Sequence, residues 1–173
     1  MDDMEKRAIV EKTLSFFARI ELPVERGEVG PDSFLPGVII RSGVLVVDEA
    51  LLAYPGDLLH EAGHVAMMEP AVRRVCSGDV GDDAGLEMGA IAWSYAAVVE
   101  LGMAPETVFH GAGYKSGGAS IIENFSRGHY FGVPILQWLG MTTERTGRTP
   151  ADATGPFYPA MHKWLRDEEL CSG

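Results

Sequence analysis

The sequence predicts a single α+β domain that is mostly helical and carries a small β-sheet. Long segments show apolar residues at helical spacing, and two short β-branched runs flank a two-residue turn. No linker or internal repeat divides the chain, and 173 residues with 46% hydrophobic composition are enough for one domain, residues 1–173, with a real core.

The first third of the chain is predicted to start with a helix and to continue into a β-hairpin. Pro23 ends the helical pattern, and Ser42-Gly43 supplies the turn of the hairpin. In chain order, the expected elements are a helix over 4–20, a loop over 24–36, strands over 37–41 and 44–48, and the start of a short helix over 48–52.

The rest of the chain is predicted to be helical, with glycine-rich connections. The expected elements are a helix from Asp57 toward Pro70, a loop over 71–85, a long helix over about 83–101, a turn or two at 105–109, a loop over 110–118, short helices over 119–126 and 133–140, a polar segment over 142–156 and a last helix over 157–169. An acidic N-cap and Gly102 mark the two ends of the long helix.

Residues 60–64, His60-Glu61-Ala62-Gly63-His64, carry the strongest chemical signal. Positions i and i+4 share one face of a helix, so two imidazoles there can bind one Zn²⁺ and leave coordination positions open. The adjacent glutamate can point at a zinc-bound water, whose pKa the metal lowers to about 7, and take its proton. Uncharged flanks, an N-cap at Asp57 and a stop at Pro70 indicate a buried helix. Two core histidines spaced by chance are the alternative interpretation.

With this motif the chain resembles the zincin metallopeptidases, and more narrowly the gluzincins, whose third ligand is a glutamate on a later helix. The resemblance covers roughly residues 43–100. It implies that His60 and His64 bind the metal and that Glu61 is the base. It also implies a minimal zincin-like domain, in which a hairpin packs beside the motif helix. The third histidine of the extended zincin signature is absent from residues 65–71.

Glu87 is the predicted third ligand. It is a lone carboxylate at the start of a helix that has no further charge through Val99, and a buried carboxylate needs a partner such as a metal. Leu86 and Ile91 stand where gluzincins often carry an asparagine and an aspartate. Two alternatives remain open: Asp82 or Asp83 binds the metal, or Glu87 only favours the first turn of its helix through the helix dipole.

The segment Ser126-Arg127-Gly128-His129-Tyr130 is the richest source of donors for a developing oxyanion. A Tyr, His or Arg donor normally helps the metal in this task. His129 and Tyr130 are therefore predicted to assist catalysis. The alternative is a turn between helices with ordinary surface side chains.

Charge and hydropathy exclude several classes of protein. A net charge of −11 argues against a nucleic-acid partner, which would need clustered Lys and Arg. The charged N-terminus and the lack of a long apolar run predict neither a signal peptide nor a membrane partner, and a cytoplasmic location is expected. Cys76 and Cys171 are expected to be free thiols, with a disulfide between them as the alternative.

Together these patterns predict a zinc-dependent hydrolase, with a metallopeptidase acting on a peptide or protein substrate as the favoured class. The second hypothesis is a zinc-binding module without peptidase activity that serves interaction or regulation. An open water position would favour the enzyme, and a fourth protein ligand would favour the module. A metal-free helical scaffold is the third hypothesis.

Overall fold

The structure is a computed structural model that describes residues 1–30, 33, 35–78, 83–113 and 117–167. It confirms the α+β, mostly helical class. The elements are α1 (Asp3–Arg19), β1 (Val24–Arg26), β2 (Val38–Arg41), β3 (Val44–Val47), α2 (Asp57–Met67), α3 (Pro70–Arg73), α4 (Ala84–Glu100), the 3-10 turn η1 (Pro105–Thr107), α5 (Gly118–Ser126) and α6 (Val133–Trp138).

The predicted hairpin is confirmed and forms part of a three-stranded sheet with the order β1-β3-β2. β2 and β3 pair antiparallel, with Ile40 opposite Leu45. Ser42 and Gly43 both have positive φ, 48° and 79°, as a two-residue hairpin turn of the twisted kind requires. β1 pairs parallel with β3. The prediction of a loop over 24–36 is wrong at residues 24–26, since this short, charged strand forms only by pairing with a distant segment.

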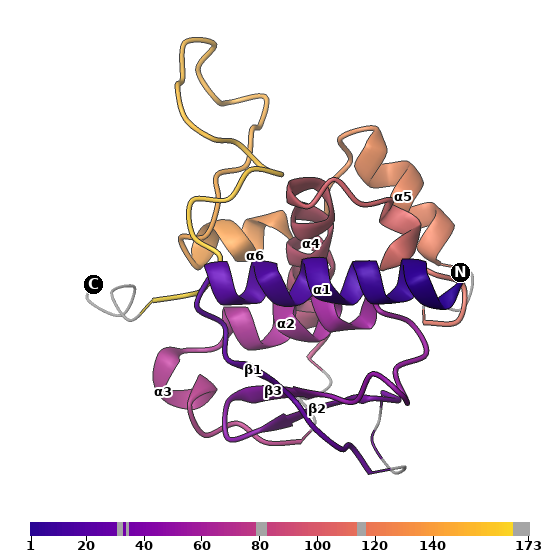
Figure 1. Cartoon of the computed structure of the whole chain (residues 1–173). Helices are drawn as coiled ribbons and strands as arrows, with labels where there is room; N and C mark the ends of the chain where they lie inside the picture. The colour runs from indigo at the N-terminus through magenta and orange to yellow at the C-terminus, as the bar shows by residue number, and fades with distance from the viewer. Residues whose placement is uncertain (31–32, 34, 79–82, 114–116, 168–173) are drawn as a thin grey trace.

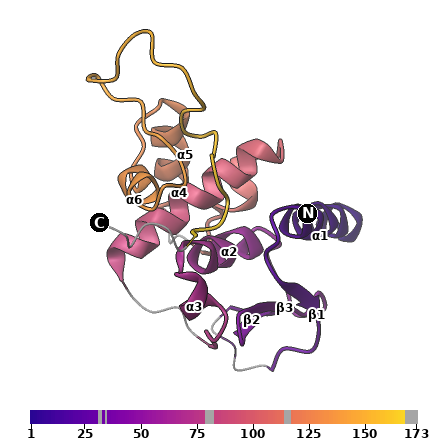
Figure 2. The same cartoon turned by 90° about the vertical axis from the view of Figure 1, so that its left-hand side faces the viewer.

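Helix α2 lies between the sheet and α4, and α1 runs beside it (Figures 1 and 2). Leu58, Leu59 and Val65 of α2 are fully buried. Between α2 and α4 the backbones approach closely, because a Cβ added at Gly63 would lie 3.1 Å from the carbonyl oxygen of Ala90. The motif helix is therefore the central element of the core.

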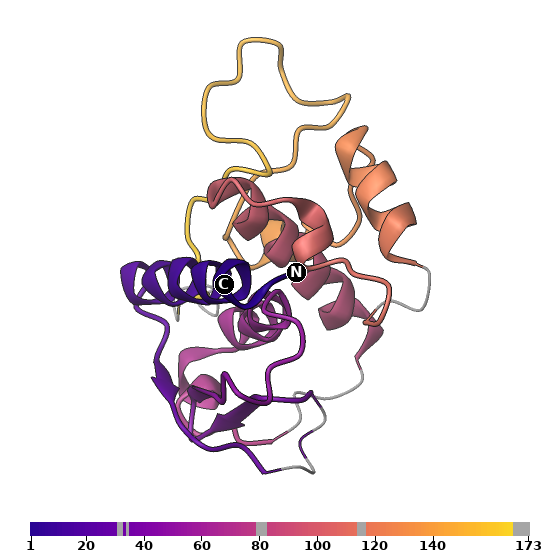
Figure 3. The same ribbon diagram turned by 45° about the vertical axis from the view of Figure 1, so that its right-hand side comes forward.

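The last helix, predicted over 157–169, is not formed in residues 157–167, the part of it that the structure describes, and there the prediction is wrong. Residues 157–167 make turns whose polar groups bond to other elements. Tyr158 donates its hydroxyl to the Ala92 carbonyl at 2.8 Å, and the Arg166 amide donates to the Ala66 carbonyl at 2.9 Å. Pro159 also interrupts the segment, since proline cannot donate within a helix. The preceding orange-to-yellow segment extends away from the helices (Figure 3).

Two smaller predictions also need correction. Residues 48–52 make a hydrogen-bonded turn, in which Leu52 donates to Asp48 at 2.9 Å, and not a helix. Pro70 begins the short helix α3 in the first-turn position that suits proline, and residues 71–73 of this helix lie in the loop predicted over 71–85. No described helix has the length and apolar character needed to cross a bilayer.

Candidate metal centre

A polar stripe runs along one side of α2. Asp57, His60, Glu61 and His64 are spaced i, i+3, i+4 and i+7, which places them on one face of a helix whose other residues are mostly apolar and buried. The predicted N-cap at Asp57 is wrong by one residue. Gly56 occupies the N-cap position, and glycine has no side chain that could accept a hydrogen bond there. A larger residue would not fit, because a Cβ at this position would lie 1.9 Å from the Thr107 carbonyl oxygen.

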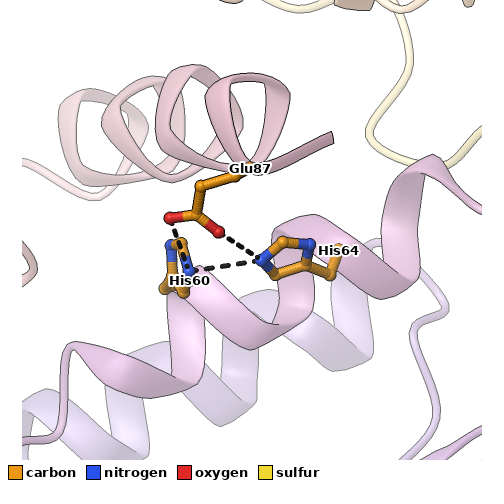
Figure 4. A group of neighbouring side chains, drawn as sticks. All are labelled: His60, His64 and Glu87. Atoms are coloured by element: carbon orange, nitrogen blue, oxygen red, sulfur yellow. Dashed lines mark hydrogen bonds and ion pairs between the residues drawn. The ribbon is translucent and has the colours of Figure 1, made fainter. Parts of the chain in front are cut away.

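His60, His64 and Glu87 converge in space, as predicted (Figure 4). The Nε2 atoms of the two histidines are 3.3 Å apart. The carboxylate of Glu87 places Oε1 at 3.5 Å from His60 Nε2 and Oε2 at 3.1 Å from His64 Nε2. Ligands at about 2.0–2.1 Å in a tetrahedron are separated by roughly 3.3 Å. Each histidine faces a different oxygen of the Glu87 carboxylate, and the separations of these atom pairs are close to those between ligands of one metal ion.

The N-terminal turn of α4 holds Glu87 in place. Asp83 caps this helix, and its Oδ1 accepts from the amides of Gly85 at 2.8 Å and Leu86 at 2.9 Å. The carboxylate of Asp83 is thus occupied as an N-cap, and the metal-binding group in the described residues does not include it. Asp82, the other alternative ligand, lies outside the described residues.

Glu87 and His60 shift each other's pKa. Hydrogen bonds from His60 and His64 lower the pKa of Glu87, against the opposing effect of burial. Burial lowers the pKa of His60, but the hydrogen bond and charge of Glu87, with the charges of Glu61 and Asp57, outweigh it and raise the pKa overall. The surroundings of the Glu87 carboxylate therefore favour positive charge beside it.

Exposure differs across the three residues. The side chains of His60 and His64 are 15% and 6% exposed, while that of Glu87 is 46% exposed. The centre is thus buried on the side of α2 and exposed to solvent on the side of α4.

Glu61 follows the first histidine and is half-buried. Burial raises the pKa of its carboxyl, and the charges of His60 and His64 partly oppose this rise. Glu61 is not a member of the ligand group. Its carboxyl is therefore left for a role other than metal binding.

The two predicted oxyanion donors have different surroundings. His129 is exposed, and Tyr130 is half-buried in an aromatic cluster. The ring centroid of Tyr130 lies 4.6 Å from that of Tyr158 and 5.4 Å from that of Phe125. The catalytic role of His129 and Tyr130 stays a prediction.

Both ends of α2 are held by contacts that the sequence pattern did not reveal. At the N-terminal end, His110 Nε2 lies 2.9 Å from Asp57 Oδ1, and the ring of Tyr54 stacks on His110. The sequence alone places Asp57 one helical turn before His60, but it does not indicate the partner of Asp57, because His110 comes from a distant loop.

At the C-terminal end, Arg73 bonds to four backbone carbonyls. It donates to Val65 at 3.0 Å, Ala66 at 3.1 Å, Met68 at 2.9 Å and Arg166 at 2.8 Å. Burial lowers the pKa of its guanidinium. A cation at a helix C-terminus satisfies carbonyls that have no partner within the helix.

The predicted thiol state concerns Cys76 and Cys171. Cys76 is a half-buried free thiol, and burial raises its pKa. Cys171, the partner in the alternative disulfide, lies outside the described residues.

Comparison with known proteins gives no relative: no family model, curated protein or solved structure matches this chain. The resemblance to zincins thus rests on the motif, and the metal-binding capacity rests on the geometry of His60, His64 and Glu87.

Proposed function

We propose that this protein is a zinc-dependent hydrolase whose substrates are peptides or proteins. The observation that carries the proposal is the convergence of His60 Nε2, His64 Nε2 and the Glu87 carboxylate at distances of 3.1–3.5 Å. Two imidazoles and one carboxylate are a donor set that Zn²⁺ accepts, and it is the set found in catalytic sites with His₂Glu ligation.

The number of ligands supports a catalytic site over a structural one. The group found among the described residues has three members, whereas structural zinc sites normally have four protein ligands. The side chain of Glu87 is 46% exposed, so solvent reaches this side of the centre. A bound zinc would supply a Lewis acid and lower the pKa of a coordinated water to about 7.

Glu61 is the proposed general base. It lies on the same face of α2 as the two histidines, and its carboxyl is half-buried beside them. It would accept a proton from the attacking water and later deliver that proton to the leaving amine. Peptides are chosen as the substrate class because the motif, with its base retained, resembles that of zincin peptidases.

The experiment starts with elemental analysis of the purified protein after incubation with zinc. We expect about one zinc per chain, with loss of the metal in His60→Ala and His64→Ala. His162→Ala is the matched control, because this exposed histidine bonds to Thr143 Oγ1 at 2.8 Å, outside the ligand group. A chain that binds no zinc overturns the proposal.

Glu61→Gln then separates the enzyme from a binding module. This variant should keep zinc and fold but lose peptide hydrolysis by about 10²–10⁴-fold, the usual contribution of a general base. Turnover is measured on a diverse peptide library, with a chelator as the second control. Zinc binding without cleavage of any peptide would favour a zinc-binding interaction or regulatory module.

A further inference from the structure

An Asp–His pair lies one helical turn before the first metal-binding histidine. The Oδ1 atom of Asp57 is 2.9 Å from His110 Nε2, and the two side chains are 14% and 12% exposed. Asp57 belongs to the polar stripe of α2, and residues i and i+3 are neighbours on a helix surface. The pair is therefore adjacent to the metal centre without being part of its ligand group.

The hydrogen bonds of His110 define what this histidine does. The amide of Gly113 donates to His110 Nδ1 at 3.2 Å, and a backbone N–H can only donate. Nδ1 is thus the acceptor, the ring proton is on Nε2, and Nε2 donates to Asp57. With both ring nitrogens engaged, His110 has no donor for a substrate, and it acts through the carboxylate.

The surroundings hold this pair in one arrangement. The ring of Tyr54 stacks on His110 with centroids 3.9 Å apart and an interplanar angle of 12°. Beside it, Gly56 packs so tightly on the Thr107 backbone that no side chain fits. Burial raises the pKa of Asp57 overall, and the hydrogen bond from His110 opposes part of this rise. The hydrogen bond and the stacked rings thus hold the Asp57 carboxyl group in one position beside His110.

We propose that Asp57 is a positioning residue of the metal centre, held by His110 so that its negative charge strengthens the binding of a divalent cation by His60, His64 and Glu87. A charge in a partly buried site acts on a cation more strongly than it would in water. Its fixed position also orients the helical turn that carries His60. This inference rests on the proposed function only through the metal that the centre binds.

Metal affinity is the direct test. The metal-free protein is titrated with Zn²⁺ in competition with a chromophoric chelator, and with Co²⁺ while its visible absorption is recorded. Asp57→Asn keeps the shape of the side chain and removes its charge, so we expect the dissociation constant for zinc to rise about tenfold or more. Asp57→Glu, which restores the charge, should recover part of this loss.

His110 and its stacking partner give a second series. His110→Ala should weaken zinc binding in the same direction as Asp57→Asn and shift the Co²⁺ bands, since the carboxylate loses its anchor. Tyr54→Ala should weaken binding while Tyr54→Phe should not, because only the ring is needed to cover the pair. These variants keep the test decisive if Asp57→Asn does not fold.

Asp3→Asn is the matched control. Asp3 is also an acidic residue in the first turn of a helix, but it lies in α1 and is exposed. Its substitution should leave metal affinity at the wild-type value. Wild-type affinity in folded Asp57→Asn, or a loss confined to the melting temperature of the metal-free protein, would overturn the inference. Failure of the wild-type protein to bind zinc would instead refute the proposed function, and it is measured first.

Discussion

The contact between α2 and α4 at Gly63 determines where Glu87 lies relative to the two histidines. A Cβ added at Gly63 would lie 3.1 Å from Ala90 O and 3.2 Å from Ala90 Cα. Ordinary carbon contacts lie at about 3.5–4.0 Å. Because the atoms in the way belong to the backbone of α4, Gly63→Ala must move this helix away from α2 by a few tenths of an ångström.

Two opposing terms set the stability of Gly63→Ala. Overpacking a well-packed core costs about 1–3 kcal/mol, and replacing glycine by alanine within a helix gains about 1 kcal/mol. We expect the metal-free protein to lose about 1 kcal/mol of its free energy of unfolding. Ligand distances in metal sites tolerate only about 0.2 Å, so the displaced Glu87 should weaken zinc binding by about tenfold, which equals about 1.4 kcal/mol.

Zinc affinity and urea denaturation of the metal-free protein are measured for wild type, Gly63→Ala and Gly63→Val. The larger side chain should weaken binding further. Gly147→Ala is the control, because a Cβ at Gly147 would meet no atom within 4 Å. Unchanged zinc affinity in folded Gly63→Ala would show that the contact at Gly63 does not set the ligand geometry.

Two further predictions concern the support of the centre and its response to pH. Arg73→Met removes four hydrogen bonds to backbone carbonyls and should lower the free energy of unfolding by about 2–4 kcal/mol in urea denaturation. Exposed Arg148→Met should change it by less than about 0.5 kcal/mol, and equal losses would contradict the assigned role of Arg73. The second prediction concerns the protein in the presence of a chelator. The lowered pKa of Glu87 stabilises the fold above about pH 4.3, the pKa of an unfolded glutamate, and this stabilisation is lost as the pH falls. The raised pKa of His60 stabilises the fold below about pH 6.5, the pKa of an unfolded histidine, and this stabilisation is lost as the pH rises through the pKa in the folded state. The melting-temperature difference between wild type and His60→Gln should therefore be largest between about pH 4.3 and 6.5, and a difference independent of pH would refute the coupling.

Elements with strong local signals were predicted nearly to the residue. The long helix was expected over 83–101 and forms α4, Ala84–Glu100, because Asp83 caps its start and Gly102, with φ of 57°, follows its end. The hairpin was equally clear from Ser42-Gly43. In both cases the information lies within a few residues of the element that it specifies.

Predictions failed where distant contacts decide the backbone. The strand β1 has only three residues and exists through its pairing with β3. Residues 157–167 show helix-like spacing of aromatic residues, yet Tyr158 and Arg166 bond to α4 and α2 instead of to their own segment. Gly56 takes the cap position of α2 because the Thr107 backbone leaves no room for a side chain.

The candidate centre was predictable as far as its donor atoms. The spacing of His60 and His64 fixes one face of one helix, and the isolation of Glu87 marked it as a residue in need of a partner. His110 was not predictable, since a lone histidine in a glycine-rich loop gives no sign that it bonds to Asp57. Residue chemistry thus identified the three residues that converge, whereas the contacts that hold their helix come from distant parts of the chain.

The contacts of His110 and Arg73, which hold the two ends of α2, form in a fixed order as the chain is synthesised. The ribosome releases His60 and His64 well before His110 and Arg166, which complete the two ends of their helix. A nascent or truncated chain that stops short of Arg166 lacks the amide that bonds to Ala66 and the carbonyl that receives Arg73. The metal affinity proposed for this centre would thus develop late, after Arg166 has left the ribosome and both ends of α2 have formed their contacts.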